Sequence, residues 1–298
     1  MRVKSFIFIR QYRAMAMLFL SALPFLSIAA HEDQHSHSGE APIVGGGAHF
    51  SWIIFHELKP DLEKLLQRDI DLYGKDSALG LGCNAGIKNA MQNAEDHETF
   101  GFVCCELDEK EVNDKKLQVH PLAYEPILIL LNKTNPIDDL TSEQIRDIFS
   151  GKIRNWSEVG GEDKAIVVVT RLHCKGRPGH WKRILPEAKL FRKDRLNVKA
   201  ADDMVRKVSD FDGAIGHIGS TWKFGKKDHI KPIKINGYAP TAKNLKAKAY
   251  PFYRTLSAVT IKSVSSDVQN LIKEVQHGRA FNRIAKKYEL LPLNTNKP

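Results

Sequence analysis

Apolar and polar positions follow a helical period in some stretches of the chain and form short unbroken apolar runs in others. Residues 49–66 (HFSWIIFHELKPDLEKLL) have the helical period, so a helix with a kink at Pro60 is expected there. Its apolar positions are Trp52, Phe55, Leu58, Leu62 and Leu65. The runs PILILLN (126–132) and AIVVV (165–169) are typical of strands that are buried on both faces. Residues 204–219 predict a helix, a turn and a strand, and 265–288 predict two closing helices.

The stretch TSEQIRDIFSGKIRNWSEVGG (141–161) contains signals for both ends of a helix. Thr141 is a good N-cap, and Gln144 completes a capping-box pattern. The apolar residues 145, 148 and 149 share one helix face. Gly151 follows where a helix commonly ends in a left-handed residue, and the pair of glycines at 160–161 predicts a turn before the next strand.

Glycine-rich loops precede three of the expected helices. A short strand at 42–47 runs into a glycine loop, LGLGCNAGIKNAM (79–91) enters a second helix, and GRPGHWKRIL (176–185) begins a third with Pro178 near its first position. FGFVCC (100–105) is a further apolar strand. Strands that alternate with helices predict an α/β fold with mainly parallel pairing.

The N-terminal pattern is that of a secretory signal peptide. Residues 1–13 hold four basic side chains and no acid, and an apolar run at 14–30 ends in small residues, which predicts cleavage near Ala29 or Ala30. A transmembrane anchor is disfavoured because the run is short and contains Pro24. We therefore expect an exported, periplasmic protein. The polar, His-rich segment 31–41 is expected to be a disordered linker, with a weak metal-catching tail as the alternative.

Net charge narrows the class of ligand. The formal charge of +10 falls by four when the signal segment is removed, and it still favours an anionic partner. Nucleic acid is not expected, because the basic residues are scattered and export removes the usual partner.

Four patches resemble the phosphate-binding subunit of phosphate ABC importers (PstS-type), within the type II periplasmic binding-protein superfamily. They are LTSEQIRDIFSGKIRNWSEVGG (140–161), IVVVTR (166–171), GAIGHIG (213–219) and YPFYR (250–254), and they occur in the family's order. The resemblance implies an α/β fold of two lobes, with sheets flanked by helices, two crossing strands and a ligand cleft between the lobes. Lobe 1 would comprise residues 42–122 plus 241–298, and lobe 2 residues 123–240.

The resemblance also implies what the protein does. It would be a non-enzymatic, monomeric binding protein that captures phosphate or a related oxyanion by lobe closure and delivers it to an ABC permease in the inner membrane. No metal and no cofactor are expected. A diverged scaffold that acts as a sensor, an interaction protein or a soft-metal binder is the alternative.

The three glycine loops fall where the family binds phosphate with backbone N–H groups at helix N-termini. The expected ligand-binding residues are Gly46, Gly47, Ala48, His49, Cys83, Asn84, Cys104, Arg171, Lys175, Gly176 and Arg177. Arg171 is the expected anion clamp, with an inter-lobe salt bridge as the alternative. Trp156 is expected to be a packing residue rather than a ligand contact.

The loops depart from the family's pattern. GGAH stands where the first loop offers hydroxyls, Cys83 and Asn84 replace Ser and Gly, and Cys104 lies at about the position of the acidic acceptor. Lys175 and Arg177 stand where hydroxyls belong. Losing the acid removes selection for a protonated oxyanion, and the two basic residues favour a larger or more highly charged anion, unless they point to solvent at the rim.

All four cysteines, Cys83, Cys104, Cys105 and Cys174, fall on segments expected to face the cleft. An oxidising compartment makes disulfides the default, for example Cys83 with Cys104 or Cys105. A soft-metal site with His49, His173 or His180 is the alternative. A thiol enzyme is the weakest hypothesis, because a nucleophilic cysteine needs an orienting histidine that spacing cannot demonstrate.

Overall fold

A computed structural model describes residues 40–75, 82–174, 177 and 179–293. The predicted signal peptide and nearly all of the His-rich linker lie outside these residues. Within the described part of the chain, no helix combines the length and the apolar character that a membrane span requires.

Strands and helices alternate along most of the chain. The strands are β1 (Ile43–Gly47), β2 (Ile70–Tyr73), β3 (Thr99–Val103), β4 (Leu117–Asn132), β5 (Asp139–Leu140), β6 (Val167–Thr170), β7 (Leu196–Asn197), β8 (Ala214–Gly219), β9 (Ile230–Pro232), β10 (Lys234–Ile235), β11 (Tyr253–Ile261) and β12 (Leu291–Pro292). The helices are α1 (His49–Leu66), α2 (Cys83–Met91), α3 (Glu109–Asp114), α4 (Ser142–Ser150), α5 (Ala201–Asp210), α6 (Ala242–Lys246), α7 (Ser266–His277) and α8 (Arg279–Lys287).

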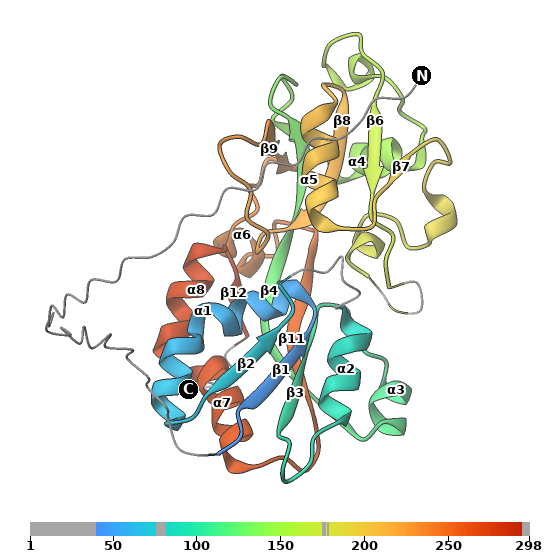
Figure 1. Cartoon of the computed structure of the whole chain (residues 1–298). Coiled ribbons are helices and arrows are strands. Elements are labelled where there is room, and N and C mark those ends of the chain that lie inside the picture. Colours follow the sequence, from blue (N-terminus) through green and yellow to red (C-terminus); the bar gives the residue numbers. More distant parts are fainter. Residues whose placement is uncertain (1–39, 76–81, 175–176, 178, 294–298) are drawn as a thin grey trace, which may run out of the picture. The chain divides into compact units, whose positions relative to one another are not determined.

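Two long strands, β4 and β11, link the two ends of the main sheet. They pair antiparallel along the whole of β11, with a register shift at Leu256/Ser257, and the far end of β4 continues into pairs with β8 and β9. The main path of strands runs β2-β1-β3-β11-β4-β8-β6-β7 (Figure 1). The chain therefore passes from one group of strands to the other along β4 and returns along β11.

The pairing of the sheet is mixed. β1 pairs parallel with β2 and β3, and β6 pairs parallel with β7 and β8, as the alternating pattern predicted. β4 and β11 make antiparallel pairs because the chain crosses between the two groups of strands in opposite directions. The predicted α/β fold is confirmed, and the expectation of mainly parallel pairing holds only within each group of strands.

Helices cover both groups of strands. Near β1, β2 and β3, Figure 1 shows α1, α7 and α8 on one side of the strands and α2 and α3 on the other. At the second group, α5 packs against β8, β6 and β4, while the apolar face of α4 packs into a cluster with β4 and β8 residues. The core therefore continues along the sheet on both of its faces.

Local signals at several helix ends are confirmed. The Thr141 side chain accepts from the Gln144 N–H, Gln144 accepts in return from the Thr141 N–H, and Gly151 has φ 86°. Trp156 is buried and its indole N–H donates to the Gly213 carbonyl at 3.0 Å, which makes it the expected packing residue. Pro60 lies inside α1, and Leu65, expected on its apolar face, is 53% exposed.

Other expectations were wrong or incomplete. The third expected helix is only a four-residue 3-10 helix, His180–Arg183, and Pro178 lies outside the described residues. β4 begins nine residues earlier than the apolar run at 126–132, since its first half pairs with β11 and has a mixed burial pattern. The pattern of apolar and polar residues predicted neither the strands β2 and β11 nor the helix α3.

A buried ion pair joins the two crossing strands. Glu125 of β4 and Arg254 of β11 are 0% and 4% exposed, and Nε of Arg254 lies 2.6 Å from a Glu125 oxygen. Thr221, just after β8, donates both its N–H and its hydroxyl to the other Glu125 oxygen at 2.9 and 2.5 Å. The Arg254 guanidinium lies over the ring of Phe50, in the first turn of α1, at 4.1 Å.

Replacing Glu125→Gln should lower the free energy of unfolding by about 3–5 kcal/mol, because Arg254 would stay buried without its counter-charge. Urea unfolding at neutral pH measures the effect. Arg283→Gln is a matched control, since Arg283 pairs with Asp61 on the surface and such pairs contribute less than about 1 kcal/mol. Equal effects of the two changes would contradict the structural role given to the buried pair.

Close backbone packing joins α2 to β3. A Cβ on Gly86 would lie 2.2 Å from the Phe102 carbonyl oxygen, and a Cβ on Gly101 would lie 1.9 Å from that of Gly86. The helix can approach the strand this closely only because both positions are glycine.

Gly86→Ala should destabilise the protein by about 1–3 kcal/mol, because α2 must move away from β3 to admit the methyl group. Chemical denaturation of Gly86→Ala and Gly225→Ala side by side measures the difference. Gly225 faces no atom closer than 3.8 Å, so its variant should change stability by no more than about 0.5 kcal/mol. A Gly86→Ala protein as stable as its control would contradict this packing argument.

Candidate functional site: arginines, thiols and imidazoles

The loop between β1 and α1 is tightly packed. Gly47 has φ 134°, and a Cβ there would lie 2.5 Å from the Phe102 oxygen. The Ala48 N–H donates to that same oxygen at 3.0 Å, while Gly46 faces the side chain of Asn89. The His49 ring is 8% exposed and lies 4.6 Å from the ring of Trp222. These four predicted ligand residues therefore have clear packing roles, and the Ala48 N–H already has an acceptor.

The first turn of α2 brings two predicted ligand residues beside β3. Cys83 begins the helix, and its buried Sγ accepts the N–H of Cys104 at 3.3 Å. The two sulfur atoms are 3.8 Å apart. Asn84 is exposed, and its side-chain oxygen accepts from Arg177. Cys104 therefore contacts the α2 N-terminus through its sulfur atom and its N–H.

Arg171 follows β6 and is buried, with 6% of its surface exposed. Its Nε donates to the Lys199 carbonyl at 2.9 Å, which fixes the direction of the side chain. Burial lowers the pKa of the guanidinium, and the nearby Cys104 opposes that shift. A buried cation beside Cys104, itself in contact with the α2 N-terminus, is an arrangement that attracts anions.

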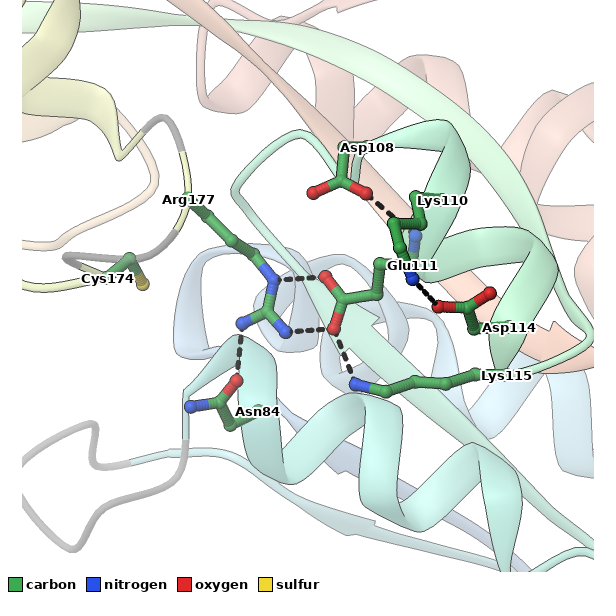
Figure 2. A pocket seen from close by; sticks show the side chains of 8 residues that line it. All are labelled: Asn84, Asp108, Lys110, Glu111, Asp114, Lys115, Cys174 and Arg177. Atoms are coloured by element: carbon green, nitrogen blue, oxygen red, sulfur yellow. Dashed lines mark hydrogen bonds and ion pairs between the residues drawn. The ribbon is translucent and has the colours of Figure 1, made fainter.

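Arg177 connects the loop after β6 to α3 and α2. Its Nε donates to one Glu111 oxygen at 2.7 Å, Nη2 pairs with the other oxygen, and Nη1 donates to Asn84 (Figure 2). Arg177, Glu111 and Asn84 line a pocket of about 570 Å³, which Cys174 also borders. Arg177 therefore lies at the mouth of the site in a forked pair with Glu111. Lys175 and Gly176, the remaining predicted ligand residues, lie outside the described residues.

The four thiols gather from three separate segments. Sulfur atoms of Cys83, Cys105 and Cys174 all lie within 4.8 Å of one another. Cys104 and Cys105 form a second such group with a ring nitrogen of His173. No two of the four cysteines are joined as a disulfide. Cys174 adopts φ 53°, a left-handed conformation that is uncommon for a side chain other than glycine.

The pKa values of the thiols are shifted in different directions. Hydrogen bonds from Cys105 and Cys83 hold the pKa of Cys174 well below its ordinary value. The pKa of Cys83 is also lowered, first by a hydrogen bond from Cys104. The pKa of Cys105 is raised, because its thiol donates to Cys104 and the other sulfur atoms and because it is buried. The shifts therefore favour the thiolate at Cys174 and Cys83 over Cys105, and the charge of Arg171 lowers the pKa of Cys174 further.

Three histidine rings lie next to one another, and the first of them, His173, adjoins the cysteine cluster. The ring of His173 lies 4.8 Å from that of His180, and His180 Nε2 lies 2.9 Å from His217 Nδ1. Burial lowers the pKa of His180 well below its ordinary value and that of His217 to about 3, so both rings are neutral at physiological pH. Neutral imidazole is the form that binds metal ions.

Sequence reasoning missed three residues of this region. Glu111 was one acid among many in a charge-rich segment, and nothing in the sequence marked it as the partner of Arg177. Arg254 lay in a patch that pointed only to the family resemblance, and the burial of its guanidinium became visible only in the structure. His217 lay inside a predicted strand, and a single histidine at such a position gives no functional signal.

Comparison with known proteins shows that the chain is similar to binding proteins. The profile of a family described as "PBP superfamily domain" matches residues 84–276. The phosphate-binding protein PstS of Bacillus subtilis is 24% identical over 258 residues, which cover 82% of each chain. A Clostridium perfringens structure described as a phosphate ABC transporter substrate-binding protein with bound phosphate superimposes with TM-score 0.68 at 25% identity, over 85% of this chain and 99% of that one. A Vibrio cholerae phosphate transport receptor gives TM-score 0.63 at 22% identity, over 85% and 100%.

Removing the charge in Glu111→Gln should lower the free energy of unfolding at pH 7 by about 1.5–3 kcal/mol, because the charged hydrogen bonds to Arg177 are lost. Arg177 holds the pKa of Glu111 at about 2, below its ordinary 4.5. Its contribution is therefore complete above about pH 4.5 and is lost as the pH falls towards 2. The difference between the native protein and the variant should shrink over that interval.

Urea unfolding at a series of pH values checks this expectation. Glu109→Gln is the control, because Glu109 is an exposed acid in the first turn of the same helix. A stability difference for Glu111→Gln that stays constant from pH 7 to pH 3 would contradict the assigned pair.

Proposed function

The chain belongs to the PBP superfamily, and from that premise we propose that it is an exported solute-binding protein that captures phosphate or a related oxyanion for an ABC importer. The names of its relatives support the ligand class. PstS of B. subtilis is described as phosphate-binding, and the C. perfringens structure contains bound phosphate. The match to each relative spans most of both chains.

The observation that carries the proposal is the convergence of buried positive charge with the first turns of two helices. Arg254 lies over Phe50 at the start of α1, with Nη1 and Nη2 lacking a hydrogen-bond partner among the described residues. Arg171 lies near Cys104, which contacts Cys83 at the start of α2. Guanidinium groups and helix N-termini together favour an oxyanion over a neutral solute.

Lobe closure around the ligand is the proposed mechanism. The lobes are taken as residues 42–122 plus 241–298 and residues 123–240, with β4 and β11 crossing between them. Arg177 and Arg183, from the second lobe, pair with Glu111 and Glu106 of the first. These pairs would hold the closed form, which a permease could distinguish from the open form.

The proposal also covers the location of the protein and the protonation state of its ligand. The protein acts outside the cytoplasm after cleavage near Ala29 or Ala30, as a monomer, with no catalytic step and no nucleic-acid partner. A thiol at Cys104 accepts a proton from the ligand less well than a carboxylate would. The site should therefore discriminate between protonated and fully ionised oxyanions less than a site with an acid there.

Titration calorimetry of ligand-stripped protein with inorganic phosphate at neutral pH tests the function. One phosphate should bind per chain, and Arg171→Ala should weaken binding by about 10- to 100-fold, because a charged hydrogen bond to the anion is lost. Arg206→Ala is the control, since Arg206 lies exposed on α5 and pairs with Asp203 of the same helix.

The thermal midpoint of Arg171→Ala must be recorded beside its affinity, because Arg171 is also a structural donor to Lys199. Sulfate and molybdate titrations separate a changed anion preference from loss of anion binding. The proposed function is rejected if none of the three anions gives heat, and the site is misplaced if Arg171→Ala binds phosphate as tightly as the control.

A further inference from the structure

Three cysteines that are distant in sequence place their sulfur atoms in one small volume. Cys83 begins α2, Cys105 follows β3, and Cys174 lies in the loop after β6. Cys83 and Cys105 are 1% and 4% exposed, and Cys174 is half-buried. From the sequence, no metal site was expected, because the four cysteines show no CxxC or similar spacing. The tertiary structure supplies the proximity that the spacing lacked.

The spacing of the sulfur atoms suits a thiolate-bound metal ion. Each pair within the group of Cys83, Cys105 and Cys174 is no more than 4.8 Å apart. With metal–sulfur bonds of about 2.3 Å, two thiolates of one tetrahedral ion are about 3.8 Å apart. Small rotations of the side chains would therefore bring three sulfur atoms onto one ion without movement of the backbone elements.

Further ligands lie beside this group. Cys104 Sγ is 3.8 Å from Cys83 Sγ, and a ring nitrogen of His173 lies within 4.8 Å of Cys104 and Cys105. A fourth sulfur or one neutral imidazole would complete a four-coordinate site, with either four thiolates or three thiolates and a histidine. Carboxylates are missing from both groups, which disfavours Mg²⁺ and Ca²⁺.

The surroundings stabilise bound thiolates and leave a route for an ion. The Cys104 N–H donates to Cys83 Sγ at 3.3 Å, as the outer hydrogen bonds of metal sites do. The charges of Arg171 and Arg177 offset the negative charge of the sulfur atoms. The pocket of Figure 2 is bordered by Cys174 and Asn84, so solvent reaches the edge of the cluster.

We propose that Cys83, Cys105 and Cys174 bind one soft metal ion, Zn²⁺ or Cu⁺, with Cys104 or His173 as the fourth ligand. Binding would join the start of α2 and the end of β3 to the loop after β6. It would therefore hold together the same segments that Arg177 joins to Glu111 and Asn84. The ligands of this site are sulfur atoms, whereas the oxyanion proposal rests on the arginines Arg171 and Arg254.

Titration of the reduced protein with Co²⁺, a coloured substitute for Zn²⁺, tests the proposal first. One equivalent should produce the strong near-ultraviolet absorption of sulfur-to-metal charge transfer, and Zn²⁺ should abolish it by displacement. Cu⁺ is titrated separately against a chromophoric chelator under anaerobic conditions. The dissociation constants for Zn²⁺ and Cu⁺ from these two competition titrations show which ion the site prefers.

Cys174→Ser is the main variant, because Cys174 lies in a loop and its loss should leave the core intact. It should weaken binding by more than the roughly 10- to 100-fold that loss of an outer-shell partner typically costs. A variant with His31, His35 and His37 changed to Gln removes the His-rich tail and should leave the charge-transfer band unchanged. His277→Gln, on the exposed end of α7, is the control within the fold.

The proposal is overturned if no sulfur band appears, if the band survives unchanged in Cys174→Ser, or if binding disappears with the three tail histidines. It is also overturned if protein purified without reductant shows every cysteine in a disulfide by mass and cannot be loaded with metal after reduction. Phosphate titration of metal-free and Zn²⁺-loaded protein separates the two sites. A protein that binds phosphate but no metal would overturn only the metal site, and a protein that binds metal but no phosphate would overturn only the proposed function.

Discussion

The ion pair between Glu125 and Arg254 is the constraint on which the rest of the structure depends. Its two residues lie directly opposite each other in the antiparallel pair of β4 and β11, so it favours this register of the two strands that connect both groups of the sheet. Thr221 ties the end of β8 to the same carboxylate, and the Arg254 guanidinium covers Phe50 at the start of α1. A charge pair this deeply buried is a weak source of net stability but strongly disfavours any arrangement that separates its partners.

That crossing brings distant segments into one region. The start of α2, helix α3 and the loop after β6 lie far apart in the sequence, yet Asn84, Glu111 and Arg177 form a single hydrogen-bonded group. The same juxtaposition gathers the four thiols. Both the proposed anion site and the proposed metal site are therefore consequences of how β4 and β11 position the segments they connect.

The two proposed sites use one electrostatic environment in different ways. Buried arginines near helix N-termini attract oxyanions, and the same positive field favours thiolates over thiols. With Cys83 at the start of α2 and Cys104 just after β3, the region offers soft sulfur ligands beside this positive charge. A binding-protein scaffold can in this way acquire a second class of ligand through substitutions in loops, without a change of fold.

The sequence by itself determined the elements with strong local signals. The capping box at Thr141, the apolar period of α1 and the buried run within β4 were all readable, because hydrogen bonds to neighbouring residues and side-chain periodicity are local properties. The resemblance extended these elements to the family fold. Only the tertiary structure decided the first half of β4, the pairing of Arg177 with Glu111 and the meeting of Cys83, Cys105 and Cys174. Such contacts depend on where strand crossing places loops in space, and spacing along a chain carries no record of that distance.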